Sequence, residues 1–174
     1  LHPGLDVPKF LAIAETDRAV GIPYGGHVSL AVGLETSIQN GYKSVEHMDG
    51  YLEAMIADKS RLEPTVAGPF NMLVVGEADQ NRLPDLIKMT LKNKTWIAPT
   101  LTLFDRYFGY VPADSFRLAP EMKYLPGLQI QQWVTQKKLL ENQGVLSKAN
   151  VQPYLDFRNQ LFLSLHEAGV PMIM

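Results

Sequence analysis

The sequence predicts an α/β fold in which an amphipathic helix, a Gly or Asn stop and a short apolar strand recur about four times. Such alternation is typical of parallel sheets with helices packed outside them. Two architectures fit the pattern, an open doubly wound sheet and part of a TIM (β/α)8 barrel. No G-x-G-x-x-G fingerprint or phosphate-binding loop is present, which argues against a nucleotide-binding sheet.

The first repeat shows how each element is justified. Asp6 is suited to the N-cap, Pro8 to the first turn and Gly21 to the C-terminal stop, which predicts a helix over 6–20 and a strand over 22–28. The same order of amphipathic helix, stop residue and apolar strand predicts helices over 30–40, 84–94 and 153–168, and strands over 43–47, 96–103 and 170–174.

The two strand-to-helix loops at 48–81 and 104–150 are long. In α/β proteins the active site lies among such loops, at the C-terminal ends of the strands. The second loop is rich in aromatic residues, including Tyr107, and contains a predicted helix near 129–143. We therefore expect one domain over 1–174 with a cap-like excursion at about 104–150. A packing decoration or an oligomer contact is the alternative interpretation of this excursion.

The composition excludes several classes of function. A net charge of −2 without a basic run gives no electrostatic footprint for nucleic acid or for an anionic membrane. No apolar run is long enough to span a bilayer. The absence of cysteine excludes disulfides, thiolate metal sites and cysteine nucleophiles, but leaves a cytoplasmic, periplasmic or secreted location open. The start at Leu1 and the apolar end "GVPMIM" predict a trimmed or partial chain.

Two of the four histidines stand where chemistry is expected. His27 and His47 each end a predicted strand, and because these strands are neighbours their side chains can converge. Gly25 and Gly26 are expected to leave room beside them for a ligand or a metal ion. Paired imidazoles suit Zn²⁺ at ~2.0–2.1 Å, although two structural histidines or one general base fit equally well. Asp49 is either a carboxylate that supports this pair or an exposed loop acid.

Four segments in order carry a resemblance to a known family: "GGHV", "SVEH", "WIAPTLTL" and "LHEAGVPMIM". The chain resembles the imidazolonepropionase-like and metal-dependent dipeptidase branch of the amidohydrolase superfamily. The resemblance implies that the chain holds strands five to eight of a TIM barrel. It implies that His27 and His47 bind one or two ions of Zn²⁺ or another divalent metal. It also implies that Thr100 and Tyr107 line the substrate pocket.

The same resemblance implies an activity. It predicts a hydrolase that cleaves an amide or cyclic amide C–N bond with metal-activated water, on a dipeptide, an acyl-amino acid or an imidazolone-like substrate. The family's H-x-H motif and bridging lysine are absent, and its general-base aspartate is expected just beyond Met174. This chain alone is therefore predicted to be catalytically incomplete.

Two other interpretations stay open. One is an inactive half-barrel that acts as a binding or assembly module, as a homo-oligomer or with a complementary half. The other is an α/β binding protein whose histidines are structural.

Overall fold

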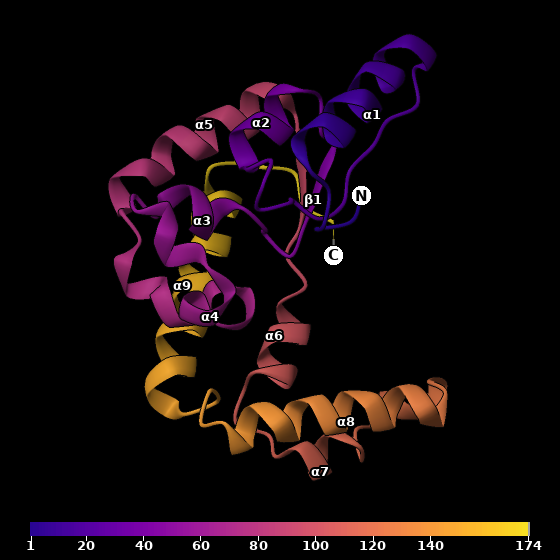
Figure 1. Cartoon of the computed structure of the whole chain (residues 1–174), viewed down its shortest axis with the longest axis vertical. Helices are drawn as coiled ribbons and strands as arrows, with labels where there is room; N and C mark the ends of the chain where they lie inside the picture. The colour runs from indigo at the N-terminus through magenta and orange to yellow at the C-terminus, as the bar shows by residue number, and fades with distance from the viewer. Residues whose placement is uncertain (174) are drawn as a thin grey trace. The chain divides into compact units, whose positions relative to one another are not determined.

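The computed structural model describes residues 1–173, and the fold is 62% helical. Figure 1 shows a largely helical chain with a short length of strand, labelled β1. The elements in chain order are α1 (Val7–Val20), α2 (Leu34–Gln39), β1 (Ser44–Glu46), α3 (Tyr51–Met55), η1 (Lys59–Leu62), α4 (Pro64–Ala67), η2 (Pro69–Glu77), η3 (Gln80–Arg82), α5 (Leu83–Asn93), β2 (Trp96–Ala98), α6 (Leu101–Tyr107), α7 (Ala113–Phe116), η4 (Pro120–Tyr124), α8 (Gly127–Asn142) and α9 (Lys148–Glu167).

The chain divides into two compact units. The first contains Leu1–Thr100 and Asn159–Met174, and the second contains Leu101–Arg158. The expected excursion at 104–150 lies within the second unit. Its role as a cap stays a prediction.

The prediction of a partial TIM barrel with four βα units is wrong. In residues 1–173 the sheet consists of β1 and β2 alone, paired in parallel with Val45 opposite Ile97. The other two expected strands are reduced to single parallel bridges, Gly26 with Val45 and Ile97 with Met172. Three paired residues per strand cannot form a barrel wall, and the described chain builds its core mainly from helices. The expected strand at 170–174 falls partly on Met174, which lies outside the described residues.

The backbone conformation shows where the expected strands are cut short. The segment expected as a strand over 96–103 leaves extended geometry at Thr100, whose φ of 47° is left-handed. It then enters α6, and Phe104 within this helix and Phe108 directly after it are buried four residues apart. The first expected strand is interrupted at Gly26, whose φ is 129°.

The helix predicted over 6–20 is confirmed as α1. The Asp6 side chain accepts a hydrogen bond from Lys9 N, and Gly21 adopts the left-handed C-cap conformation. Phe10 is buried and lies 6.0 Å from Tyr42 between ring centroids. This contact anchors α1 to the core of the first unit.

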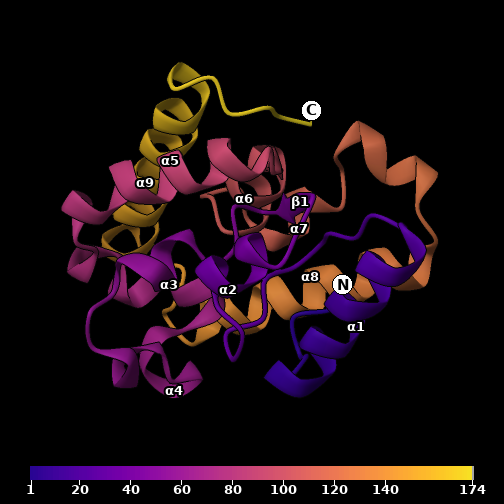
Figure 2. The same ribbon diagram turned by 90° about the horizontal axis from the view of Figure 1, so that it is seen from above.

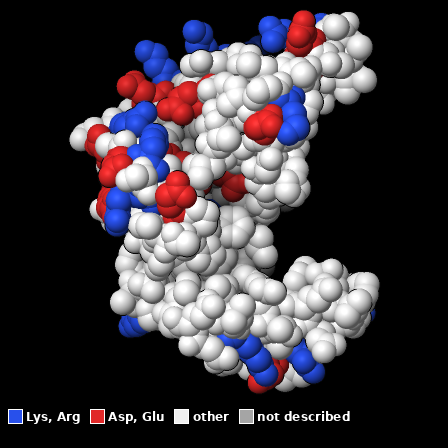
Figure 3. Space-filling model, in the orientation of Figure 1, with Lys and Arg blue, Asp and Glu red and all other residues white. Residues whose placement is uncertain are grey.

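The loop expected over 48–81 is folded. It contains α3, η1, α4 and η2, and ends with η3. The helices α2, α3 and α5 lie side by side in both ribbon views (Figures 1 and 2). Tyr51 of α3 and Thr90 of α5 share a buried hydrogen bond of 2.6 Å. Acidic and basic side chains intermingle over the part of this unit that holds α3 and α4 (Figure 3).

The second unit has its own small apolar core. Phe116 and Val134 are buried there with Ala113 and Met122. Lys137 of α8 is also fully buried. Its ammonium donates to the carbonyl oxygens of Arg106 at 2.6 Å and Gly109 at 3.1 Å, so that it binds the end of α6.

None of the helices in residues 1–173 combines the length and the apolar composition that a membrane crossing requires.

Candidate functional site

The parallel pairing brings His27 and His47 together. Gly26 N donates to Ser44 O at 3.1 Å, and Glu46 N donates to Gly26 O at 3.0 Å. These bonds place the residues that follow Gly26 and Glu46 side by side. The two imidazole rings lie 4.8 Å apart between centroids, at an interplanar angle of 38°. The predicted convergence of the two histidines is therefore present, although it depends on a single bridge rather than on two full strands.

Each imidazole is oriented by an oxygen atom at Nδ1. His27 Nδ1 lies 2.8 Å from Asp49 Oδ2, and His47 Nδ1 lies 2.5 Å from Thr100 Oγ1. A carboxylate at Nδ1 holds the proton on that nitrogen and directs the Nε2 lone pair to the other side of the ring. Asp49 is therefore the carboxylate that supports His27, and the alternative of an exposed loop acid is excluded by this contact.

The backbone is strained at this site. His47 and Met48 both have φ of 57°, and Thr100 has φ of 47°. Left-handed geometry is unfavourable for residues with a Cβ atom, and its cost is on the order of 1 kcal/mol each. The left-handed geometry turns the segment after β1 and the segment after β2 out of the sheet, at the point where His47 and Thr100 meet.

The glycines before His27 serve close packing instead of leaving room for a ligand. A Cβ atom on Gly25 would lie 2.2 Å from Ser44 Oγ, and one on Gly26 would lie 2.1 Å from Leu1 N. The space beside both glycines is therefore filled by the chain itself. The expectation that they leave room for a ligand or a metal ion is corrected here.

A small pocket of about 240 Å³ opens beside His27. Asp49, Glu53 and Phe70 line it, together with backbone near Gly33 and Gly50. Phe70 also lies 6.3 Å from His47 between ring centroids, in an edge-on arrangement. The pocket therefore places an imidazole, two carboxylates and an aromatic face around one space.

Glu53 is the residue that sequence reasoning missed. It belongs to α3, and its Oε1 accepts a hydrogen bond of 2.6 Å from Asn71 Nδ2. Burial raises the pKa of the Glu53 carboxyl, and the Asp49 carboxylate acts in the same direction, while the bond from Asn71 opposes both. The side chain retains partial solvent access because it lines a cavity. A carboxyl with these surroundings is a candidate for ligand binding.

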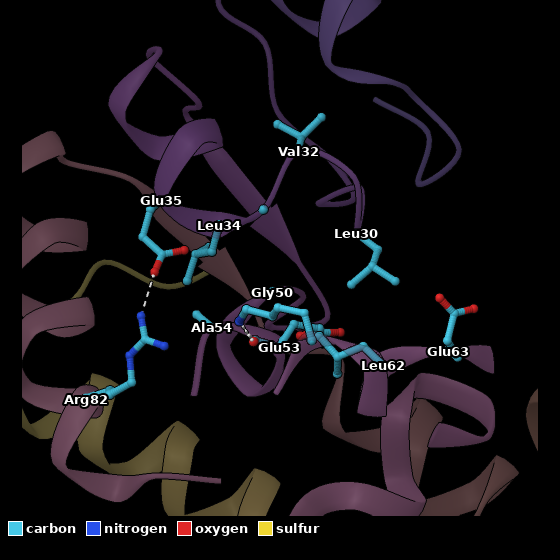
Figure 4. A pocket seen from close by; sticks show the side chains of 12 residues that line it. Leu30, Val32, Leu34, Glu35, Gly50, Glu53, Ala54, Leu62, Glu63 and Arg82 are labelled. Carbon is cyan, nitrogen blue, oxygen red and sulfur yellow. Dashed lines mark hydrogen bonds and ion pairs between the residues drawn. The ribbon is translucent and has the colours of Figure 1, made fainter. Parts of the chain in front are cut away.

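A second, larger pocket of about 470 Å³ adjoins the first. Its apolar walls include Val32, Leu34 and Leu62. Figure 4 shows Glu35 and Arg82 joined on one side of this pocket and Glu63 on the other side, with Glu53 between them. Pockets of this size accommodate small organic ligands.

The structure places the remaining predicted residues as follows. Thr100 is at the site through its bond to His47, which is a position beside the imidazole. Tyr107 belongs to the second unit, where its ring contacts Phe108 at 5.1 Å between centroids, so its predicted role in substrate binding stays a prediction. Within residues 1–173, no three or more His, Asp or Glu side chains are grouped so that they could hold a metal ion together. The general-base aspartate was expected beyond Met174, outside the described residues.

Comparison of the chain with known protein families, with curated proteins and with solved structures found no match.

Proposed function

We propose that His27 and His47 bind a divalent metal ion, and that the chain serves as a metal-dependent hydrolase of amide or cyclic amide C–N bonds. The observation that carries the proposal is the pair of imidazoles 4.8 Å apart, each oriented at Nδ1 by an oxygen atom. Orientation by a carboxylate or hydroxyl at the far nitrogen is the usual support for a histidine that coordinates metal through Nε2.

The donor set fits such an ion in part. Neutral imidazole suits Zn²⁺, and Asp49 favours the tautomer of His27 that coordinates through Nε2. Two histidines supply two of the four positions of a tetrahedral site. The other ligands must come from water, from substrate or from protein groups outside this set. The chain is accordingly proposed as the contributor of half of the ligand set.

The chain's own residues would each have a task in this reaction. A bound divalent ion supplies an activated water and polarises a carbonyl. His27 and His47 would fix the position of that ion, and Asp49 would hold His27 in place through its 2.8 Å contact. The Phe70 ring would shield one side of His47 from water. Thr100 would keep the His47 ring from rotating.

A binding module without catalysis is the second candidate function. The two-nitrogen donor set and the large adjoining pocket favour it, because a pocket can bind a ligand even where a ligand set is too small for turnover. The two functions differ in whether a C–N bond is cleaved.

Titration with Zn²⁺ and Co²⁺ tests the proposal. The wild-type chain should bind one or two ions, and His27→Asn or His47→Asn should each lower the affinity at least about tenfold. His166→Asn is the matched control because His166 is exposed, stacks on Phe162 near the end of α9 and lines neither of the two pockets. Metal affinity that is equal in all four proteins would contradict the proposal.

A hydrolysis assay separates the two candidate functions. The metal-loaded chain is incubated with dipeptides, acyl-amino acids and a cyclic amide, and free amine is measured. Cleavage that both histidine variants abolish supports the hydrolase. Metal binding without any cleavage supports the binding module.

A further inference from the structure

The two pockets beside His27 share a wall. Leu30, Gly33, Gly50 and Glu53 line both of them. A ligand in either pocket therefore lies beside these four residues. Glu53 is the shared residue with an ionisable side chain, and it stands at the junction.

The charged groups of the larger pocket are unevenly balanced. Arg82 is paired with Glu35 at 3.2 Å. The Lys59 ammonium donates to the carbonyl oxygens of Glu53 at 2.7 Å and Ile56 at 2.8 Å, which ends α3. Both cations are therefore already engaged by groups of the protein.

The two other carboxylates have no such partner. Among residues 1–173, no cation forms an ion pair with Glu53 or with Glu63. Glu53 is bound by the neutral amide of Asn71. The pocket lining thus holds three glutamates against one lysine and one arginine, which leaves it acidic. Its remaining walls are apolar, so they suit a hydrocarbon chain.

We propose that the joined pockets bind a ligand that carries an ammonium or guanidinium group on an aliphatic stem, with the cation between Glu53 and Glu63. The stem packs on Leu34, Ala54 and Leu62, which line the same pocket. A carboxylate that faces a cation in a partly dehydrated site forms a strong, charge-assisted hydrogen bond. The site would therefore select a basic ligand over a neutral one of the same shape.

The proposed cation site rests on the proposed hydrolase function only in one respect, which is the identity of the bond that is cleaved. If a metal ion is held at His27, the smaller pocket takes the amide group of the same ligand, because Glu53 borders both spaces. The substrate class is then an amide or dipeptide with a basic side chain. Binding of the cation itself requires no metal ion.

Calorimetric titration with the Nα-acetylated amides of arginine and citrulline, called arginine amide and citrulline amide below, tests the inference directly, because the acetyl group removes the α-ammonium charge from both probes. The two probes have closely similar shapes and differ in the charge of the side-chain terminus. The wild-type chain should prefer arginine amide by about tenfold, and the preference should weaken as salt is raised. Glu53→Gln and Glu63→Gln should each reduce it severalfold. The control is Glu15→Gln, which removes one charge from an exposed position of α1.

The outcomes separate this inference from the proposed metal function. A preference for arginine amide that persists in His27→Asn but falls in Glu53→Gln supports the cation site, whatever the result with metal. Glu63 is exposed, so its variant is expected to fold and keeps the test decisive if Glu53→Gln does not fold. Equal binding of the two probes, no binding of arginine amide, or a preference unchanged in both glutamate variants would overturn the inference.

Discussion

Glu53 in the first unit and Lys137 in the second are both ionisable groups withdrawn from water, and their surroundings differ. Lys137 donates to two carbonyl oxygens and lies 5.9 Å from the centroid of the Phe116 ring. Glu53 accepts from a single side-chain amide and borders two pockets. A buried ionisable group whose hydrogen bonds the protein satisfies contributes to the fold, whereas an ionisable group that faces a cavity is suited to bind a ligand.

Removal of the Lys137 side chain should give the largest change in the free energy of unfolding. Lys137→Ala leaves the Arg106 and Gly109 carbonyls without their donor and opens a gap in the second unit's core. We expect the free energy of unfolding to fall by about 2–4 kcal/mol, measured by urea denaturation. Lys138→Ala is the control because Lys138 pairs with the largely exposed Asp114, and it should cost under about 1 kcal/mol. Equal losses in the two variants would remove the structural role assigned to Lys137.

Neutralising Glu53 should stabilise the fold, whereas removal of Lys137 should destabilise it. Because burial raises the pKa of the Glu53 carboxyl, the ionised form is disfavoured in the folded chain. Its contribution to stability is present below the pKa of the unfolded chain and is lost as pH rises through the folded value. Glu53→Gln keeps the acceptor for Asn71 and should raise Tm by a few degrees at neutral pH.

The pH dependence makes this second prediction specific. The gain in Tm from Glu53→Gln should shrink as pH falls toward the range where Glu53 is protonated in both states. Thermal melts at several pH values measure it, with Glu15→Gln as the reference. A variant that melts below the wild type at neutral pH would show that Glu53 is structural, as Lys137 is.

Much of the local structure was predictable from the sequence. The caps of α1 lie within a few residues of one another, so Asp6 and Gly21 could be read without knowledge of the fold. The helix expected over 84–94 is present as α5, and its apolar spacing is local as well, because Leu86 and Thr90 are buried four residues apart. The meeting of His27 and His47 followed from consecutive parallel segments, which the structure retains as a bridge and a short sheet.

Local sequence patterns did not predict the lengths of the strands or the burial of Glu53. Apolar residues after Thr100 suit a buried strand and a buried helix alike, and the left-handed turn at Thr100 selects the helix. Glu53 reads as a surface acid in "YLEAM". Its burial depends on a distant segment in which Phe70 and Asn71 adopt left-handed φ of 50° and 59° and present the Asn71 amide. No local pattern encodes that contact.

The smallest effect on stability, and a sharp test of the acidic pocket, is expected from Arg82. Arg82→Gln releases Glu35 from an ion pair whose side chains are each 40% exposed, so the free energy of unfolding should change by under about 1 kcal/mol. The pocket would nevertheless gain one uncompensated carboxylate. Arginine amide should then bind a fewfold more tightly in calorimetry, while citrulline amide should be unaffected.

Arg61→Gln is the matched control for this change. Arg61 pairs with Glu77 at 2.7 Å, and neither residue lines the two pockets. Its loss alters the net charge of the protein by the same amount, so any effect of overall charge on ligand binding appears in both variants. Tighter binding in Arg82→Gln alone assigns the effect to the pocket. An equal change in both variants would mean that long-range charge governs the preference, and that Glu53 and Glu63 do not form a cation site.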